Sequence, residues 1–154
     1  MSTSIATTNN NIDHIVLKEI TIVNASFNNK SNLTVLPTDV DYDFDFTIQP
    51  SANLVEKWLK FVFSCTVNVC RKDKNKLDIA SNFEIAYIFI VDNLDQIAKE
   101  LPNNQIQVPQ DVLDSLYNIT YSTSRGIIYT RCLGTIMKNV IIPVVSTPKL
   151  RGRQ

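Results

Sequence analysis

The chain has 154 residues, of which 44% are hydrophobic and 19% are charged. This is enough apolar material for one domain with a buried core, and too much for an intrinsically disordered chain. The 15 Lys and Arg residues balance the 15 Asp and Glu residues, which argues against binding of a phosphate backbone as the main task, because such proteins carry a basic excess. With so little net charge to keep copies apart, we expect the protein to hide apolar surface by oligomerising.

The two ends of the chain differ in composition from the middle. Residues 1–11 are rich in Ser, Thr and Asn and lack the basic and apolar regions of a secretory signal. We interpret them as a flexible arm, residues 12–150 as a single domain, and the basic residues 151–154 as a loose tail. The three cysteines lack metal-type spacing, which is typical of reduced thiols in a cytoplasmic protein.

The first strand-like segment, residues 15–27, changes phase along its length. Ile20 and Ile22 share one face, whereas Val23, Ala25 and Phe27 share the other. A switch of the apolar face predicts a strand that is bulged or bent, or one that is covered on both sides.

The second segment alternates strictly between acidic and apolar residues. One face carries Asp41, Asp43 and Asp45, and the other carries Tyr42, Phe44, Phe46 and Ile48. The pattern predicts a half-buried antiparallel strand with a wet acidic face, ended by Pro50. The three aspartates could hold a metal ion or work as a carboxylate pair, but a solvated strand face is the simpler interpretation.

Two more strands are predicted over residues 58–70 and 79–91. The third has one apolar face, from Leu59 to Val69. The fourth is apolar on both faces in its second half, which predicts cover on both sides. The charged residues 71–76 between them favour a hairpin loop, although their three lysines could bind an anion. Trp58 and the other aromatic residues are expected in the core.

A helix is predicted after a polar connection, residues 92–108. Pro109 and Asp111 are typical of a helix start, apolar residues continue at helical spacing, and Gly134 is a suitable stop. Small residues between Ser122 and Gly126 favour close approach of another helix. Four strands followed by one long helix predict an α+β fold, with the helix packed on one face of a four-stranded antiparallel sheet.

Catalytic chemistry is sparse in the sequence. His14 is the only histidine and lies beside the arm, and three glycines are too few for a phosphate-binding loop. Cys65 and Cys70 are expected on opposite faces of one strand and so cannot share an ion. We therefore expect a protein that is not an enzyme. A small hydrolase or isomerase that uses Asp43 or His14 is the alternative, and it lacks an evident base and nucleophile.

The last third of the chain carries a short motif and a distinctive segment after it. Residues 121–126, Tyr-Ser-Thr-Ser-Arg-Gly, lie late in the predicted helix, and an apolar extended stretch with a proline follows at residues 139–143. Both features resemble the SecB family of export chaperones, whose long helix carries a Ser-Arg-Gly signature and then enters an apolar crossover loop. The order of strands upstream agrees over most of residues 15–150.

The resemblance implies a SecB-like homotetramer, a dimer of dimers, in the cytoplasm. Such a chaperone binds unfolded polypeptide clients (preproteins) in apolar grooves for protein transport, passes them to the SecA translocase motor, and uses no cofactor or nucleotide. This chain departs from the family because it is neutral rather than acidic and because no second helix is evident after the first. A SecB-like chaperone dedicated to one client, such as an antitoxin, would fit equally well, and a structural interaction module is a further alternative.

The apolar segment after the helix is the candidate client site, because it has no obvious place in a one-helix sheet domain. The predicted polypeptide-binding residues come from this segment and the second strand: Phe44, Phe46, Ile136, Met137, Val140, Ile141 and Ile142. The alternative is that all seven are core or interface residues. Arg125 and Gly126 are expected to be structural, with Arg125 paired to an acid or to loop carbonyls near the carboxyl end of the helix.

Overall fold

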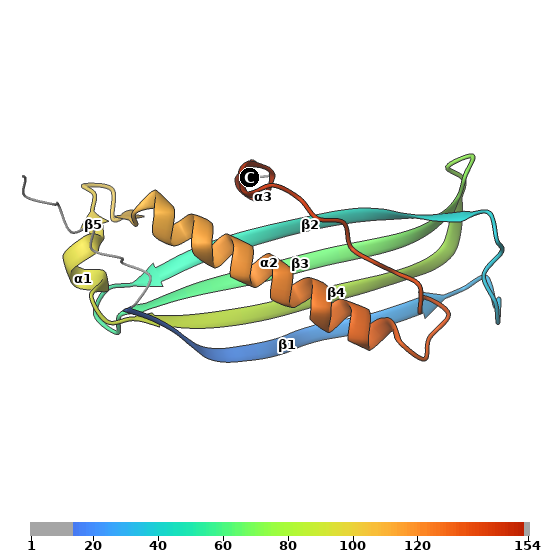
Figure 1. Ribbon diagram of the computed structural model, residues 1–154, viewed down its shortest axis with the longest axis horizontal. Helices are drawn as coiled ribbons and strands as arrows, with labels where there is room; N and C mark the ends of the chain where they lie inside the picture. Colours follow the sequence, from blue (N-terminus) through green and yellow to red (C-terminus); the bar gives the residue numbers. More distant parts are fainter. Residues whose placement is uncertain (1–13, 153–154) are drawn as a thin grey trace, which may run out of the picture.

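A computed structural model describes residues 14–152, so the proposed arm lies outside the described residues. Four long strands form one antiparallel sheet in the order β1-β4-β3-β2: β1 (Ile15–Asn29), β2 (Val40–Asn53), β3 (Trp58–Arg71) and β4 (Lys76–Val91). The helix α2 (Gln110–Cys132) crosses one face of this sheet diagonally (Figure 1). The α+β architecture predicted from the sequence is therefore confirmed.

The core lies between α2 and the two central strands. Every second residue of β3 and β4 is buried on the helix side, as the alternating pattern predicted. Tyr117 and Tyr121 of α2 pack their rings on this layer, with centroids 5.3 Å from Phe61 and 5.1 Å from Phe46. Each fully buried large apolar side chain contributes about 1.5–3 kcal/mol, so this layer holds the helix on the sheet.

On the other face of the sheet, no helix of residues 14–152 covers the strands (Figure 1). Ile88 and Ile90 are half-buried there, so the prediction that the second half of this strand is covered on both faces is wrong for the single chain. Trp58 also lies on this face, opposite Ile90, and its indole N–H donates to Glu56 Oε2 at 2.6 Å. The prediction that Trp58 lies in the core is also wrong, because its position in the pleat directs its side chain away from α2.

The phase change in β1 is resolved by β-bulges. The register with β4 shifts between Leu17 and Glu19 and again between Ile22 and Asn24. The second shift passes over Val23, so Ile22 and Ala25 lie opposite Ile85 and Phe83 on the same side of the sheet. The predicted bulge is confirmed, and it keeps Ile20, Ile22 and Phe27 on the helix side, whereas Val16, opposite Ile90, lies on the other face.

We expected Pro50 to end its strand, but the strand continues past it. It lies inside β2, opposite Phe61, and pairing continues to Asn53. The reason is position: β2 is an edge strand, where the missing N–H of a proline points to no partner strand.

The connection from β4 to α2 contains structure that the sequence pattern did not reveal. A single turn, α1 (Leu94–Ile97), precedes a short hairpin of β5 (Lys99–Glu100) and β6 (Ile106–Gln107). At the hairpin tip Asn104 has φ of +59°, and its N–H donates to the Leu101 carbonyl at 3.0 Å. Asparagine tolerates this left-handed conformation better than most residues.

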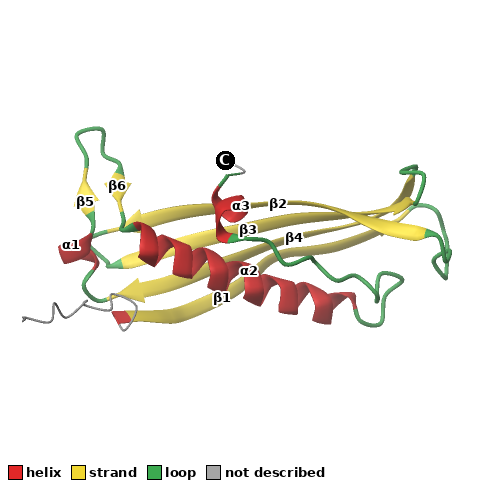
Figure 2. Cartoon of the chain, turned by 45° about the horizontal axis from the view of Figure 1, so that its top comes forward, coloured by secondary structure: helices red, strands yellow, loops and turns green. Residues whose placement is uncertain are grey.

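The chain leaves α2 at Gly134, whose φ of +79° explains why a glycine stands at the predicted stop. Residues 135–146, here called the crossover segment, then run back along α2 to a short second helix, α3 (Thr147–Arg151) (Figure 2). The expectation that no second helix follows α2 is therefore wrong. Arg151 is not in a loose tail either, because it belongs to α3 and its Nε lies 3.3 Å from Asp114 Oδ1.

Candidate functional site

The crossover segment is anchored to one flank of α2 through its backbone. The Tyr121 hydroxyl donates to the Pro143 carbonyl at 2.7 Å, and Arg125 Nε donates to the Ile142 carbonyl at 2.8 Å. Where the segment ends, the Thr147 hydroxyl donates to Asn118 Oδ1 at 3.1 Å. These contacts hold an irregular stretch of chain in one conformation without a strand partner.

The anchored segment buries some apolar side chains and exposes others. Met137, Val140 and Ile142 are buried in the core, whereas Ile141 is 67% exposed and Val144 is 79% exposed. Because the buried side chains and the backbone bonds fix the segment, the two exposed side chains are presented to solvent at fixed positions. Large exposed apolar side chains on a fixed backbone are typical of a contact surface.

The seven predicted client-binding residues are therefore divided by the structure. Phe46 is buried like the three core residues of the crossover segment, so these four follow the alternative interpretation in the single chain. Phe44 and Ile136 are half-buried against the core, and Ile141 is exposed. We call Phe44, Ile136, Ile141 and Val144 the crossover surface. Val144 was missed, although the apolar run from Ile136 to Val145 was the signal that could have found it.

Arg125 binds a loop carbonyl, one of the two kinds of partner expected for it. The expected reason needs correction. Arg125 lies seven residues before the helix end at Cys132, about two turns away, and the helix dipole acts only within the last turn. Its hydrogen bond instead links the middle of α2 to the crossover segment.

Gly126 lies on an exposed part of α2, and a Cβ added to it would have nothing within 4 Å. A glycine inside a helix costs about 1 kcal/mol relative to alanine. Nothing within the single chain explains why a glycine stands there.

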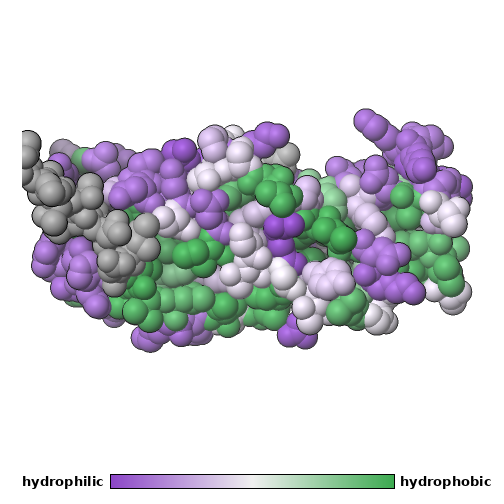
Figure 3. Space-filling view, viewed as in Figure 1, coloured by the Kyte–Doolittle hydropathy of each residue, from purple (hydrophilic) through white to green (hydrophobic). Residues whose placement is uncertain are grey.

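A second apolar surface lies between β1 and α2. Leu17, Ile20 and Phe27 point to the helix side of the sheet, yet each is about 40% exposed because α2 covers the central strands and not this edge. Ile119 on α2 and Leu133, directly after the helix end, are also exposed. Figure 3 shows the apolar surface gathering along β1 beneath the helix. We call these five residues the β1 surface.

The groups considered for catalysis do not form a site. His14 directly precedes β1 and Asp43 lies on β2, at opposite edges of the sheet, and both are exposed. Burial, with Asp45 and Cys132 nearby, raises the pKa of the Cys65 thiol to about 12, and burial raises the pKa of Cys132 to about 11. Both thiols are therefore protonated at neutral pH and poor nucleophiles.

Metal-binding clusters and membrane-spanning helices are both absent from the described residues. No cluster of three or more His, Cys, Asp or Glu side chains within residues 14–152 could hold a metal ion. In the same part of the chain, no helix is both long enough and apolar enough to cross a membrane.

Comparison with known proteins gives a match at the level of structure. No family model matches the sequence, and no curated protein matches it. Among solved structures, the fold matches a SecB-like chaperone from Mycobacterium tuberculosis, Rv1957, with a TM-score of 0.60 and 13% identity, over 88% of this chain and 93% of that one. The fold is SecB-like.

That solved structure is a complex of Rv1957 with a ChAD peptide from the antitoxin Rv1956 HigA1. A protein of unknown function from Streptococcus agalactiae also matches, with a TM-score of 0.38 and 8% identity over 86% of this chain and 96% of that one. The fold of Rv1957 therefore agrees with the fold implied by the resemblance of residues 121–126 and 139–143 to the SecB family.

Proposed function

We propose that this protein is a SecB-like chaperone that binds non-native polypeptide segments and is not an enzyme. The observation that carries the proposal is the crossover segment, which presents Ile141 and Val144 to solvent on a backbone fixed by Tyr121 and Arg125. Apolar side chains on a preformed surface bind many sequences, because they demand no particular hydrogen bonds from the ligand.

The crossover surface is the proposed client site. Its exposed members supply apolar contact area, and the half-buried Phe44 lies on β2, an edge strand. An edge strand offers unpaired backbone groups to an extended segment, which provides affinity without sequence selection. No step of this binding requires a nucleotide or a cofactor.

We further propose that copies of the chain associate through the β1 surface, with a homotetramer built as a dimer of dimers as the expected state. The apolar side chains of the β1 surface lie exposed beside the edge of β1, which within residues 14–152 pairs only with β4, and the chain has no net charge to oppose association. The glycine at position 126, unexplained in the single chain, would allow close approach of a helix from a second copy.

Two kinds of client are compatible with the proposal. A general export chaperone in the cytoplasm would bind preproteins and pass them to the SecA motor. A chaperone with one dedicated client is favoured by the neutral charge and by the complex of Rv1957 with an antitoxin peptide. Addition of purified SecA separates the two, because only the export role predicts that the motor binds the loaded chaperone.

The crossover surface is tested by paired substitutions on exposed valine and isoleucine residues. Ile141→Asp with Val144→Asp places two carboxylates on the surface and should weaken binding of reduced, carboxymethylated lactalbumin at least tenfold. Val55→Asp is the control, because Val55 is 92% exposed in the turn between β2 and β3. Equal binding by both variants would remove the crossover surface from the site.

A further inference from the structure

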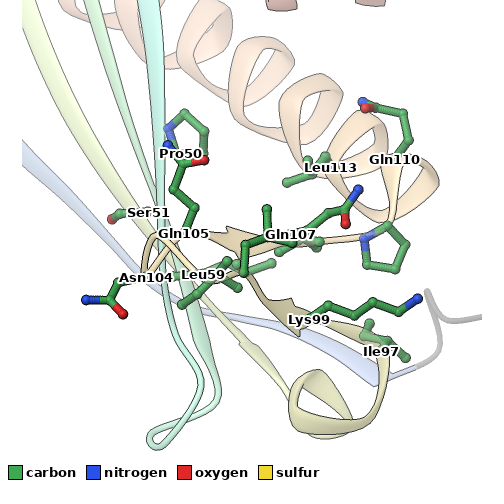
Figure 4. Close-up of a pocket in the computed structure, with 15 residues that line it drawn as sticks. Pro50, Ser51, Leu59, Ile97, Lys99, Asn104, Gln105, Gln107, Gln110 and Leu113 are labelled. Carbon is green, nitrogen blue, oxygen red and sulfur yellow. The ribbon is translucent and has the colours of Figure 1, made fainter.

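A pocket of about 990 Å³ lies at the end of the sheet where the β5–β6 hairpin meets α2. Residues 50–52 of β2 form one side, the hairpin forms another, and the first turns of α2 close it with Gln110 and Leu113 (Figure 4). We call it the hairpin pocket. Its volume is at the upper end of the range for ligand pockets in proteins.

Two strands present their edges to this pocket. Pro50, Ser51 and Ala52 are consecutive in β2 and all three line it, as do the consecutive residues Ile106 and Gln107 of β6. Successive side chains of a strand point to opposite faces, so consecutive lining residues mean that the backbone itself borders the space. In residues 14–152 β2 pairs only with β3, and β6 pairs only with β5. Unpaired backbone groups therefore face the pocket from two sides.

The lining combines an apolar floor with a rim of amides. Leu59 and Leu113 contribute to the floor, and the side chains of Asn104, Gln105 and Gln107 lie at the rim. Amide side chains both donate and accept hydrogen bonds, which is what the backbone of a peptide requires of its surroundings. Among the described residues that line the pocket there is no histidine, cysteine or carboxylate, so the lining suits binding and not catalysis.

Lys99 is the single cation in this lining. No carboxylate within residues 14–152 forms an ion pair with it, because the pairs found there involve Lys57, Arg71 and Arg151. An uncompensated lysine beside neutral amides favours a ligand with one negative charge.

We propose that the hairpin pocket is a second polypeptide-binding site, which takes an extended segment with apolar side chains and one acidic residue placed against Lys99. This rests on the proposed function and adds to it a preference for charge. The β5–β6 hairpin, which lines the pocket, and the crossover segment lie on either side of α3 (Figure 2). A client long enough to reach both sites would bind more tightly than through either alone, because the second contact forms within the same complex.

The test uses charge reversal on both partners. The probes are two fluorescent eight-residue peptides of alternating valine and serine, one with a central glutamate and one with a central lysine. A partly exposed ion pair is worth up to about 1 kcal/mol, so the wild-type chain should bind the glutamate peptide roughly two- to fivefold more tightly. Lys99→Glu should reverse this preference. Lys72→Glu, an equal charge change in the β3–β4 loop, should leave it unchanged.

The outcomes separate this proposal from the proposed function. If wild type and Lys99→Glu show the same ratio of affinities, or if Lys72→Glu reverses the ratio as well, the hairpin pocket is not the site. If the wild-type chain binds reduced lactalbumin but neither short peptide, the pocket proposal fails and the chaperone proposal stands. If neither the peptides nor lactalbumin bind, both fail.

Discussion

At the scale of single residues, apolar side chains of the crossover segment lie in opposite environments. Met137 is fully buried and Ile141 is 67% exposed, although both are large apolar residues in one irregular stretch. A charge at the first position would lose its hydration, whereas a charge at the second would stay in water. A charge at position 137 therefore tests folding, and a charge at position 141 tests binding.

We predict that Met137→Asp destabilises the protein by about 3 kcal/mol or more, since it buries an unpaired carboxylate and leaves a cavity. Ile141→Asp should change the free energy of unfolding by about 0.5 kcal/mol at most. Urea denaturation followed by circular dichroism measures both. Equal losses of stability would show that Ile141 is part of the core and not of a surface.

The buried thiols predict how stability depends on pH. In the folded state the pKa of Cys65 is raised to about 12, above its ordinary value of 9.0, with burial as the largest cause. Above pH 9 the unfolded chain loses this proton while the folded chain keeps it, so the stability contributed by the thiol is lost as pH rises toward 12. Cys65→Ala should give a smaller fall in unfolding free energy between pH 8 and pH 10.5 than wild type. An unchanged slope would contradict this.

At the scale of elements, the long strands and the helix were predictable and the short pieces were not. The burial of β3 and β4 followed from strict alternation, and the bulge beside Val23 followed from a phase change in β1. Two-residue strands such as β5 and β6 show no period, and α3 is a five-residue helix with Pro148 inside its first turn. Such elements form through tertiary contacts, among them the buried Leu150, which a local pattern does not contain.

The location of the candidate client site was predictable from the sequence, but the exposure of its individual side chains was not. An apolar run after the helix pointed to residues 136–145, but an irregular segment has no period from which to tell Ile142, which is buried, from Ile141, which is exposed. The division depends on Arg125 and Tyr121, which hold the backbone from the side of α2. Contacts between distant residues decided which side chains face solvent.

The attachment of the crossover segment to α2 is tested at Arg125. Arg125→Ala removes the donor to the Ile142 carbonyl, and we predict a loss of about 1–2 kcal/mol, because a charge-assisted hydrogen bond is lost at a partly buried site. For a chain of this size each kcal/mol lowers Tm by about 2–4 °C. Scanning calorimetry measures the change. An unchanged Tm together with unchanged client binding would show that this contact does not hold the segment.

Two glycines of the same region should respond in opposite ways to alanine. Gly134 has φ of +79°, so Gly134→Ala should destabilise the chain by about 1 kcal/mol.

Gly126→Ala should favour the helix by about 1 kcal/mol if the position is exposed in solution. If instead α2 contacts a second copy there, the alanine should weaken assembly, seen as a smaller mass by light scattering. A wild-type monomer would contradict the proposed assembly.

At the scale of the whole molecule, two apolar surfaces are left open by one helix on a four-stranded sheet. The helix crosses the sheet diagonally, so it leaves the β1 edge uncovered at one side, and the crossover segment lies along the other (Figures 1 and 2). We assign the first to self-association and the second to clients. The fold that leaves both surfaces open is SecB-like.

The central claim is that the chain distinguishes non-native from native polypeptides. Isothermal titration of the purified wild-type chain with reduced, carboxymethylated lactalbumin, at several temperatures, tests it most directly, with native lactalbumin as the control. Binding through apolar surface predicts saturable heats for the unfolded form with a negative change in heat capacity, and no binding of the native form. An absence of binding to the unfolded form, or equal binding of both forms, would contradict the account.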